Sequence, residues 1–241
     1  MATFHFEVKT GGKGRAAPHS LYIARQGKFR GRDDLVLTGS GNLPFWADGN
    51  PVKLWKAADA HERENGSAYR EMIVALPNEI GISGLRDLVE DLVRLLAGSK
   101  PYQFAVHEPQ ASLDARVNTH MHLMVSDRLP DAIERDELQM FRRYNGVRPD
   151  AGGCRKDGGG MTRVQLRDRL IALRCNVAAV LNGHLERHGF EGVLDHRTLE
   201  QQGVARRPER HLGPARIRSM SVTERLAYVD GRRAFQGQGI R

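Results

Sequence analysis

Three histidines in the middle of the chain have the spacing of a metal site. His120 and His122 lie two residues apart in the apolar segment THMHLMVS, and His107 ends a second apolar segment, YQFAVH. Side chains two apart on a β-strand point to the same face, so these two imidazoles aim in one direction. With His107 on the same face of another strand, three imidazoles would hold one cation and leave positions open for a substrate oxygen.

The H-x-H pair by itself also fits surface histidines on a half-exposed strand, so the third histidine carries the prediction. We interpret the remaining histidines as structural or surface residues: His5, His19, His61, His184, His188, His196 and His211. Among them His5, which lies between Phe4 and Phe6, is the strongest exception.

Tyr22, in the basic segment PHSLYIARQGKFRGR, is the candidate nucleophile. A tyrosine phenolate can attack phosphorus and form a covalent phosphotyrosine, which splits one hard hydrolysis into two easier transfers. Free tyrosine has a pKa near 10, so about one phenol in a thousand is ionised at pH 7 and a base, a cation or a metal must help. Glu71 is the candidate base, and an ion pair with a neighbouring arginine is the alternative for it.

Basic residues at both ends of the chain indicate a polyanionic partner. Residues 1–32 carry seven Lys or Arg against one acid, and residues 201–241 carry nine Arg against three acids, in a chain of formal charge +8. Clustered Lys and Arg bind phosphates, although a solvated tail explains the second cluster equally well. The predicted nucleic-acid contacts are Arg15, Arg25, Lys28, Arg30 and Arg32. Bases could stack on Phe29, Trp46 or Trp55, for each of which core packing is the alternative.

Four segments have the alternation of β-strands: residues 3–9, 69–76, 102–107 and 119–126. One parity collects the apolar side chains Phe4, Phe6, Val8, Met72, Val74, Leu76, Tyr102, Phe104, Val106, Met121, Leu123 and Val125. The other parity collects His5, Glu7, Lys9, Glu71, Gln103, His107, His120, His122 and Ser126. We therefore predict an α+β fold: an antiparallel sheet with helices packed on its apolar face and the three-histidine metal site on the other.

Helical spacing of apolar residues predicts helices over residues 53–64, 83–97 and 162–188, the second of them capped by Ser83 and stopped by Gly98. Residues 146–160 hold six glycines and a proline, which predicts a mobile loop. The segment after Gly231 has too little apolar content to become ordered. We predict one domain over residues 1–215 and a basic, partly disordered tail over residues 216–241.

Length and composition fit a single soluble domain. A chain of 241 residues can bury one good core. It has no uninterrupted apolar run of membrane-span length and no apolar stretch of a secretory signal near its start, so we expect a cytoplasmic protein. Cys154 and Cys175 are too few for a disulfide framework, and we expect reduced thiols.

The site residues belong to a longer series of motifs that strongly resembles the MobA/MobL family of plasmid mobilisation relaxases, members of the histidine-hydrophobe-histidine endonuclease group. In the order of the family, the series comprises YIARQGKF (22–29), WKAADAHERENG (55–66), REMIVALP (70–77), AVHEP (105–109), THMHLMVSDR (119–128), RRYNG (142–146), DHRTLEQQG (195–203) and RHLGPA (210–215). By this resemblance Tyr22 takes the place of the nucleophile. His107, His120 and His122 take the places of the metal ligands, with Mn²⁺ or Mg²⁺ as the expected ion.

The resemblance implies site- and strand-specific nicking and rejoining of DNA at a plasmid transfer origin through a 5′-phosphotyrosine. The DNA would be bound as a hairpin arm followed by a single strand. The implied partners in a bacterial cytoplasm are accessory relaxosome proteins and the coupling protein of a type IV secretion system, without membrane insertion.

The chain departs from the pattern of the family in two respects. Family members often have two acids before the ALP element, whereas here Ile73 fills the second place after Glu71, which leaves the base open. Many relatives continue into primase, helicase or membrane-associated regions that 241 residues cannot hold, so we expect a minimal relaxase or a relaxase fragment.

Three other functions fit part of the pattern. A rolling-circle replication initiator of the same endonuclease group often has two tyrosines one helical turn apart, but the residue four after Tyr22 is Gln26. A non-catalytic DNA-binding protein with incidental histidines would not nick DNA. A three-histidine zinc hydrolase of small molecules would not need the basic flank around Tyr22.

Overall fold

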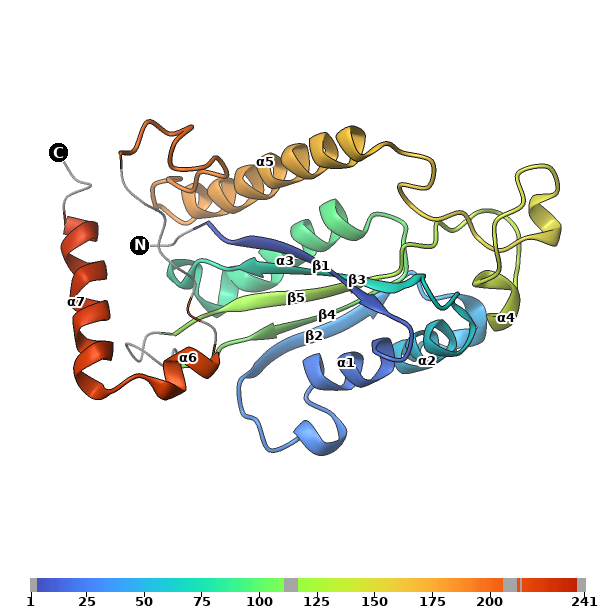
Figure 1. The fold of residues 1–241 in the computed structure, drawn as a ribbon, viewed down its shortest axis with the longest axis horizontal. Helices are drawn as coiled ribbons and strands as arrows, with labels where there is room; N and C mark the ends of the chain where they lie inside the picture. Colours follow the sequence, from blue (N-terminus) through green and yellow to red (C-terminus); the bar gives the residue numbers. More distant parts are fainter. Residues whose placement is uncertain (1–3, 111–116, 206–211, 213, 238–241) are drawn as a thin grey trace. The chain divides into compact units, whose positions relative to one another are not determined.

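The computed structural model describes residues 4–110, 117–205, 212 and 214–237 (Figure 1). The chain divides into two compact units: Met1–Glu108 with Thr119–His196, and Pro109–Asn118 with Arg197–Arg241. The sheet, the three histidines and Tyr22 all belong to the first unit. Within the described residues, no helix combines the length and the apolar character that a membrane crossing requires.

A five-stranded antiparallel sheet forms the centre of the first unit (Figure 1). Its strands are β1 (Phe6–Gly12), β2 (Leu35–Gly41), β3 (Ser67–Ala75), β4 (Tyr102–His107) and β5 (His120–Val125), in the order β1-β3-β5-β4-β2. The sequence predicts four of these strands, and the first begins at Phe6 rather than at residue 3. It does not predict β2, because the edge segment LVLTGSG combines glycines and hydroxyls with a short apolar run.

The apolar face of the sheet carries the main core. Eight of the twelve side chains predicted for this face are buried in one hydrophobic cluster, and the other four, Phe4, Val8, Tyr102 and Phe104, are partly buried and pack against it. Helices α3 (Gly81–Ala97) and α5 (Arg163–Arg187) pack together over it and bury leucines such as Leu88, Leu92 and Leu181 (Figure 1). Each leucine buried in this way contributes roughly 1.5–3 kcal/mol. The predicted α+β fold is confirmed.

Local signals set the ends of these two helices. Thr162 and Gln165 form a reciprocal capping box at the start of α5. Ser83 is not the cap of α3, because the helix begins at Gly81 and Ser83 lies within its first turn. The helix ends at Gly98 as predicted, with a φ of 57° that favours glycine.

Helices α1 (Ala16–Ile23) and α2 (Pro51–His61) cover part of the opposite face (Figure 1). The sequence predicts α2 within a few residues but not α1, which has Pro18 in its first turn and no local side-chain cap. Instead, the carboxylate of Asp59 on α2 accepts hydrogen bonds from the backbone nitrogens of Ala16 (2.9 Å) and Ala17 (2.8 Å). A residue distant in sequence therefore satisfies the free donors at the start of α1.

The glycine-rich region at residues 146–160, which the sequence predicts as a mobile loop, is held by close backbone contacts. A Cβ on Gly152 or Gly153 would collide with the backbone of Asn145 or Arg142, so these glycines permit a close approach of two chain segments. Next to and within this region lie the short elements α4 (Glu137–Met140) and η4 (Pro149–Ala151). Three more single turns complete the first unit: η1 (Gly27–Phe29), η2 (Phe45–Ala47) and η3 (Asn78–Ile80).

The second unit contains α6 (Pro214–Ser219) and α7 (Val222–Gly237). Ser221 and Glu224 exchange two hydrogen bonds at the start of α7. This capped helix extends through Gly231 to Gly237, where the sequence predicts disorder, and residues 238–241 lie outside the described residues. The predicted domain boundary after residue 215 falls within α6 and remains a prediction.

Candidate active site

The three predicted metal ligands lie together at one end of β4 and β5. His107 is paired with His120 across the two strands, and His122 follows on the same face. The ring centroids are 4.9 Å (His107–His122), 5.0 Å (His120–His122) and 5.7 Å (His107–His120) apart. One ring nitrogen of each lies within 4.8 Å of the others, so this donor set fits a cation with three nitrogen ligands.

His107 is fully buried (0% exposed), and both of its ring nitrogens have partners. Nε2 donates to the carbonyl oxygen of Ile23 (2.7 Å), and Nδ1 accepts from Nη2 of Arg25 (3.1 Å), because a guanidinium can only donate. Burial lowers the pKa of His107 to about 4, assisted by the positive charge of Arg25 and opposed by the bond to Ile23. The imidazole is therefore neutral at pH 7, the state that a metal ligand requires, and coordination of a cation by His107 would replace one of these two hydrogen bonds.

The lowered pKa of His107 predicts loss of stability in mild acid. The imidazole takes up a proton near its usual pKa of 6.5 in the unfolded chain and near 4 in the folded chain. The contribution of His107 to the free energy of unfolding is therefore complete above pH 6.5 and is lost as the pH falls toward 4. In EDTA, urea unfolding of the His107→Gln variant should show a shallower pH dependence across this interval, since Gln does not titrate. Equal slopes for wild type and variant would contradict the assignment.

Glu71 on β3 joins two histidines. Its Oε1 atom lies 2.7 Å from Nδ1 of His122 and 2.7 Å from Nε2 of His19. Burial raises the pKa of Glu71, but the hydrogen bonds from the two imidazoles outweigh it and lower the pKa to about 2. A carboxylate with so low a pKa is a weak base, so Glu71 is poorly suited to the predicted role of accepting the proton of Tyr22. The geometry favours a carboxylate that orients His122, whose Nε2 is then the atom available to coordinate a cation.

His19, which the sequence leads us to interpret as a structural or surface residue, is part of the site. It precedes Tyr22 by three residues on α1, and the two rings stack with centroids 5.8 Å apart. Its other neighbour is Tyr69, at 5.3 Å. The H-x-x-Y spacing places both side chains on one helix face, but this signal is readable only once α1 is known to be a helix.

Tyr22 projects from α1 toward the histidine cluster. The centroid of its ring lies 6.5 Å from that of His107 and 6.4 Å from that of His122. Phe29 packs edge-on against it at 5.2 Å, and the guanidinium of Arg32 lies 5.5 Å from the ring centroid. Tyr22 is half-buried, so one part of its ring is fixed by neighbours and another part faces solvent.

Arg25, one of the five predicted nucleic-acid contacts, has an internal role instead. It is 7% exposed and donates two hydrogen bonds to Asp34 (2.7 and 2.6 Å). Its φ of 52° strains a residue with a side chain. The guanidinium also contacts the carbonyl oxygen of Tyr22 and Nδ1 of His107, and it lies 4.7 Å from the centroid of the Tyr22 ring, so Arg25 positions the site from within. The other predicted contacts are at least partly exposed: Arg15, Lys28, Arg30 and Arg32.

Core packing accounts for one of the predicted stacking aromatics. Trp55 is fully buried, and its Nε1 donates to Oε1 of Gln103 (2.8 Å). Ser20 donates to the same oxygen (2.7 Å), which ties α1 and α2 to β4. Trp46 and Phe29 remain partly exposed.

The antiparallel sheet, the imidazole cluster and the helix-borne tyrosine beside it are together the features of a protein of the relaxase class. Residues 19–221 match the MobA/MobL family, and the chain belongs to that family.

Two curated relatives carry related names. The chain is 43% identical to the 43 kDa relaxation protein of Salmonella typhimurium over 86% of its own length and 56% of the relative. It is 37% identical to mobilization protein A of Escherichia coli over 89% of its own length and 30% of the relative. The chain thus spans about half the length of the first relative and about a third of the length of the second.

A solved structure supports the fold. Described as the molecular basis of vancomycin resistance transfer in Staphylococcus aureus, it superposes with a TM-score of 0.59 at 19% identity, covering 82% of this chain and 100% of that chain. A manganese-bound MobM relaxase domain in complex with oriT DNA aligns over 91% of this chain and 100% of that chain, with a TM-score of 0.46 and 12% identity.

Proposed function

We propose that this chain nicks and rejoins one strand of plasmid transfer-origin DNA through a covalent intermediate on Tyr22. The observation that carries the proposal is the position of Tyr22, whose ring lies 6.4–6.5 Å from two of the three clustered imidazoles, next to exposed basic residues. Tyrosine, metal ligands and phosphate-binding side chains are the parts that such a transesterification requires.

His107, His120 and His122 would hold a divalent cation, with Mn²⁺ or Mg²⁺ as the candidates. When bound, the ion would supply Lewis-acid polarisation of the scissile phosphate and offset negative charge in the transition state. Glu71 keeps His122 in one orientation, and Arg25 and Ile23 orient His107, which would exchange one of their two hydrogen bonds for the cation.

In the proposed reaction, Oη of Tyr22 bonds to phosphorus while the bond from phosphorus to the 3′ oxygen breaks. Overall, the proton of the phenol is transferred to the 3′ oxygen, which leaves as a hydroxyl, so atoms and charge balance. The 5′ phosphate remains on Tyr22. Because the phosphotyrosine ester replaces a phosphodiester of similar kind, the 3′ hydroxyl can attack it in reverse and reseal the strand without ATP.

Exposed basic residues next to the tyrosine would bind the phosphates of the DNA backbone. Arg30 and Arg32 follow η1, and Arg32 lies over the Tyr22 ring. In the cell we propose a role in initiating conjugative mobilisation, with accessory relaxosome proteins and a secretion coupling protein as partners.

The test is a nicking assay on supercoiled plasmid that carries the matching transfer origin. With Mn²⁺ or Mg²⁺, the chain should produce a nick at one site and on one strand, and protein should stay attached to the 5′ end after denaturation. EDTA should abolish both products. Nicking without a denaturation-resistant adduct would indicate a hydrolytic nuclease, and binding without nicking would indicate a DNA-binding protein.

A further inference from the structure

A second basic surface lies far from Tyr22 in the sequence. Residues 141–155, here called the arginine loop, expose Arg142, Arg143, Arg148 and Tyr144. Within the described residues, the side chains of Arg142 and Arg143 make no hydrogen bond or ion pair, and Arg148 has one long contact of 3.8 Å with Asp150. These guanidinium groups are available to a partner.

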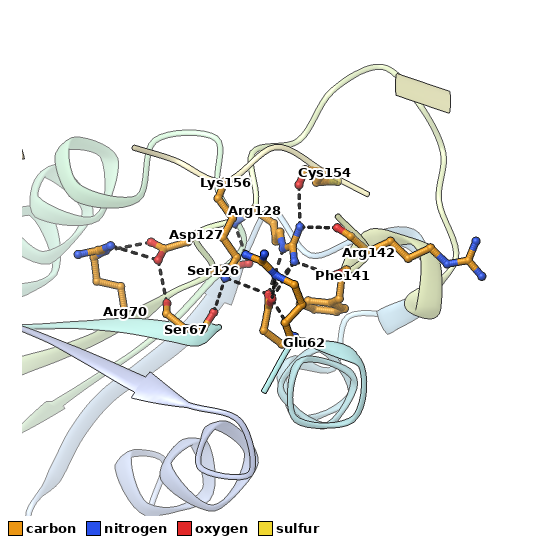
Figure 2. A network of polar contacts seen from close by, with 11 residues as sticks. Glu62, Ser67, Arg70, Ser126, Asp127, Arg128, Phe141, Arg142, Cys154 and Lys156 are labelled. Carbon is orange, nitrogen blue, oxygen red and sulfur yellow. Dashed lines mark hydrogen bonds and ion pairs between the residues drawn. The ribbon is translucent and has the colours of Figure 1, made fainter. Parts of the chain in front are cut away.

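A buried guanidinium holds both ends of the arginine loop. Arg128, 3% exposed, donates to the carbonyl oxygens of Phe141 (2.6 Å), Arg142 (2.8 Å) and Cys154 (2.8 Å). Its charge is balanced by Glu62 at the end of α2, with which it makes hydrogen bonds of 2.8–3.2 Å. Figure 2 shows this network, and in it the side chain of Arg142 extends away from the cluster.

Further contacts fix the shape of the arginine loop. Arg135 donates to the carbonyl oxygens of Gly152 (3.0 Å) and Pro149 (2.9 Å). At the tip, Oδ1 of Asn145 accepts from the backbone nitrogens of Val147 and Arg148, both at 3.0 Å. A loop held in this way loses little conformational freedom when it binds a partner.

The arginine loop is built on the face of the sheet that carries the histidines. Met140, Phe141 and Cys154 belong to the second hydrophobic cluster, together with residues of α1 and α2. Arg128 follows the end of β5, whereas His120 begins that strand. At roughly 3.3 Å per residue, β5 is about 17 Å long from His120 to Val125, and Arg128, which holds the loop, lies three residues beyond that end. This length corresponds to about five base pairs of duplex DNA, at about 3.4 Å per base pair.

We propose that the arginine loop is a second DNA contact, which binds backbone phosphates of the segment flanking the nicking site. The proposal rests on the proposed function for its ligand. Arginine forks match phosphate oxygens, and a rigid, positively charged loop on the active face, at least about one half-turn of duplex from the histidines, has the position to bind them. The loop adds affinity and orientation for the DNA and takes no part in the bond exchange.

Binding can be measured apart from chemistry in a Tyr22→Phe background. The probe is a fluorescent hairpin with a single-stranded 3′ tail, titrated at several salt concentrations. The triple variant Arg142→Gln, Arg143→Gln, Arg148→Gln should bind more weakly, and the slope of log K against log salt should flatten by about 0.7–0.9 per lost contact. The matched control triple Arg86→Gln, Arg94→Gln, Arg167→Gln removes three exposed arginines from α3 and α5 on the opposite side of the sheet.

Two further comparisons make the result decisive. A hairpin arm shortened so that it no longer reaches the loop should bind wild type and loop variant equally. The loop variant of the active protein should still form the covalent adduct on saturating DNA. Equal affinity and equal slope for the loop and control triples would overturn the proposal, as would a loss that persists with the shortened arm. If the active protein forms no adduct but its DNA binding still depends on the loop, the proposed function is refuted and the proposed loop contact stands.

Discussion

Replacement of Tyr22 by Phe should abolish the protein–DNA adduct and reduce nicking by about 10⁴-fold or more, the scale on which loss of a nucleophile acts. The substitution removes one oxygen and keeps the ring, so the packing against His19 and Phe29 is preserved. Folding, metal binding and DNA affinity should therefore be unchanged. Gel analysis after denaturation measures the adduct, and mass spectrometry of the wild type should place the nucleotide on a peptide that contains Tyr22.

Two other tyrosines test the specificity of this result. Tyr69 also lies near His19, but it is buried, and burial together with the charge of Glu71 raises the pKa of its phenol. It is therefore poorly suited to attack phosphorus. Tyr102 lies on the apolar face and is the matched control: Tyr102→Phe should leave the adduct intact. An adduct that maps to another tyrosine, or normal nicking by Tyr22→Phe, would refute the assignment.

Substitution of the metal ligands should have the second large effect. In His122→Ala, one of three imidazoles is lost, and both metal affinity and nicking should fall by more than the roughly 10–100-fold that loss of a ligand-orienting partner causes. Glu71→Gln keeps the shape of the side chain but removes its charge. This variant should lower metal affinity and nicking by roughly 10–100-fold. Isothermal titration with Mn²⁺ reports metal affinity independently of DNA.

His61 on α2 provides the control for the ligand series, because it lies outside the imidazole cluster. His61→Ala should bind Mn²⁺ and nick DNA as the wild type does. Full activity of His122→Ala in the presence of EDTA would eliminate the metal mechanism.

The sequence by itself determined the faces of the sheet. Side-chain alternation in four segments assigned twelve residues to the core face, and all twelve are buried in the core cluster or pack against it. The opposite parity assigned His107, His120 and His122 to the other face, because a strand has a fixed period of two residues and needs no tertiary information to sort its side chains. The glycine after α3 and the capping box of α5 were similarly local signals.

Only the tertiary structure decided how the rest of the site is assembled. Helix α1 lacks a cap of its own and depends on Asp59, which lies on a different helix. His19 joins the site because this helix stacks it on Tyr22 and extends it to Glu71 on β3.

The same holds for two buried arginines, of which the sequence predicted Arg25 as a nucleic-acid contact. Arg25 is turned inward by Asp34 and His107, and Arg128 is buried against Glu62. Whether a charged side chain faces solvent or an internal partner depends on groups far away in sequence. A guanidinium can be buried only where such groups supply a countercharge and hydrogen-bond acceptors. Only the folded chain brings these groups next to the arginine.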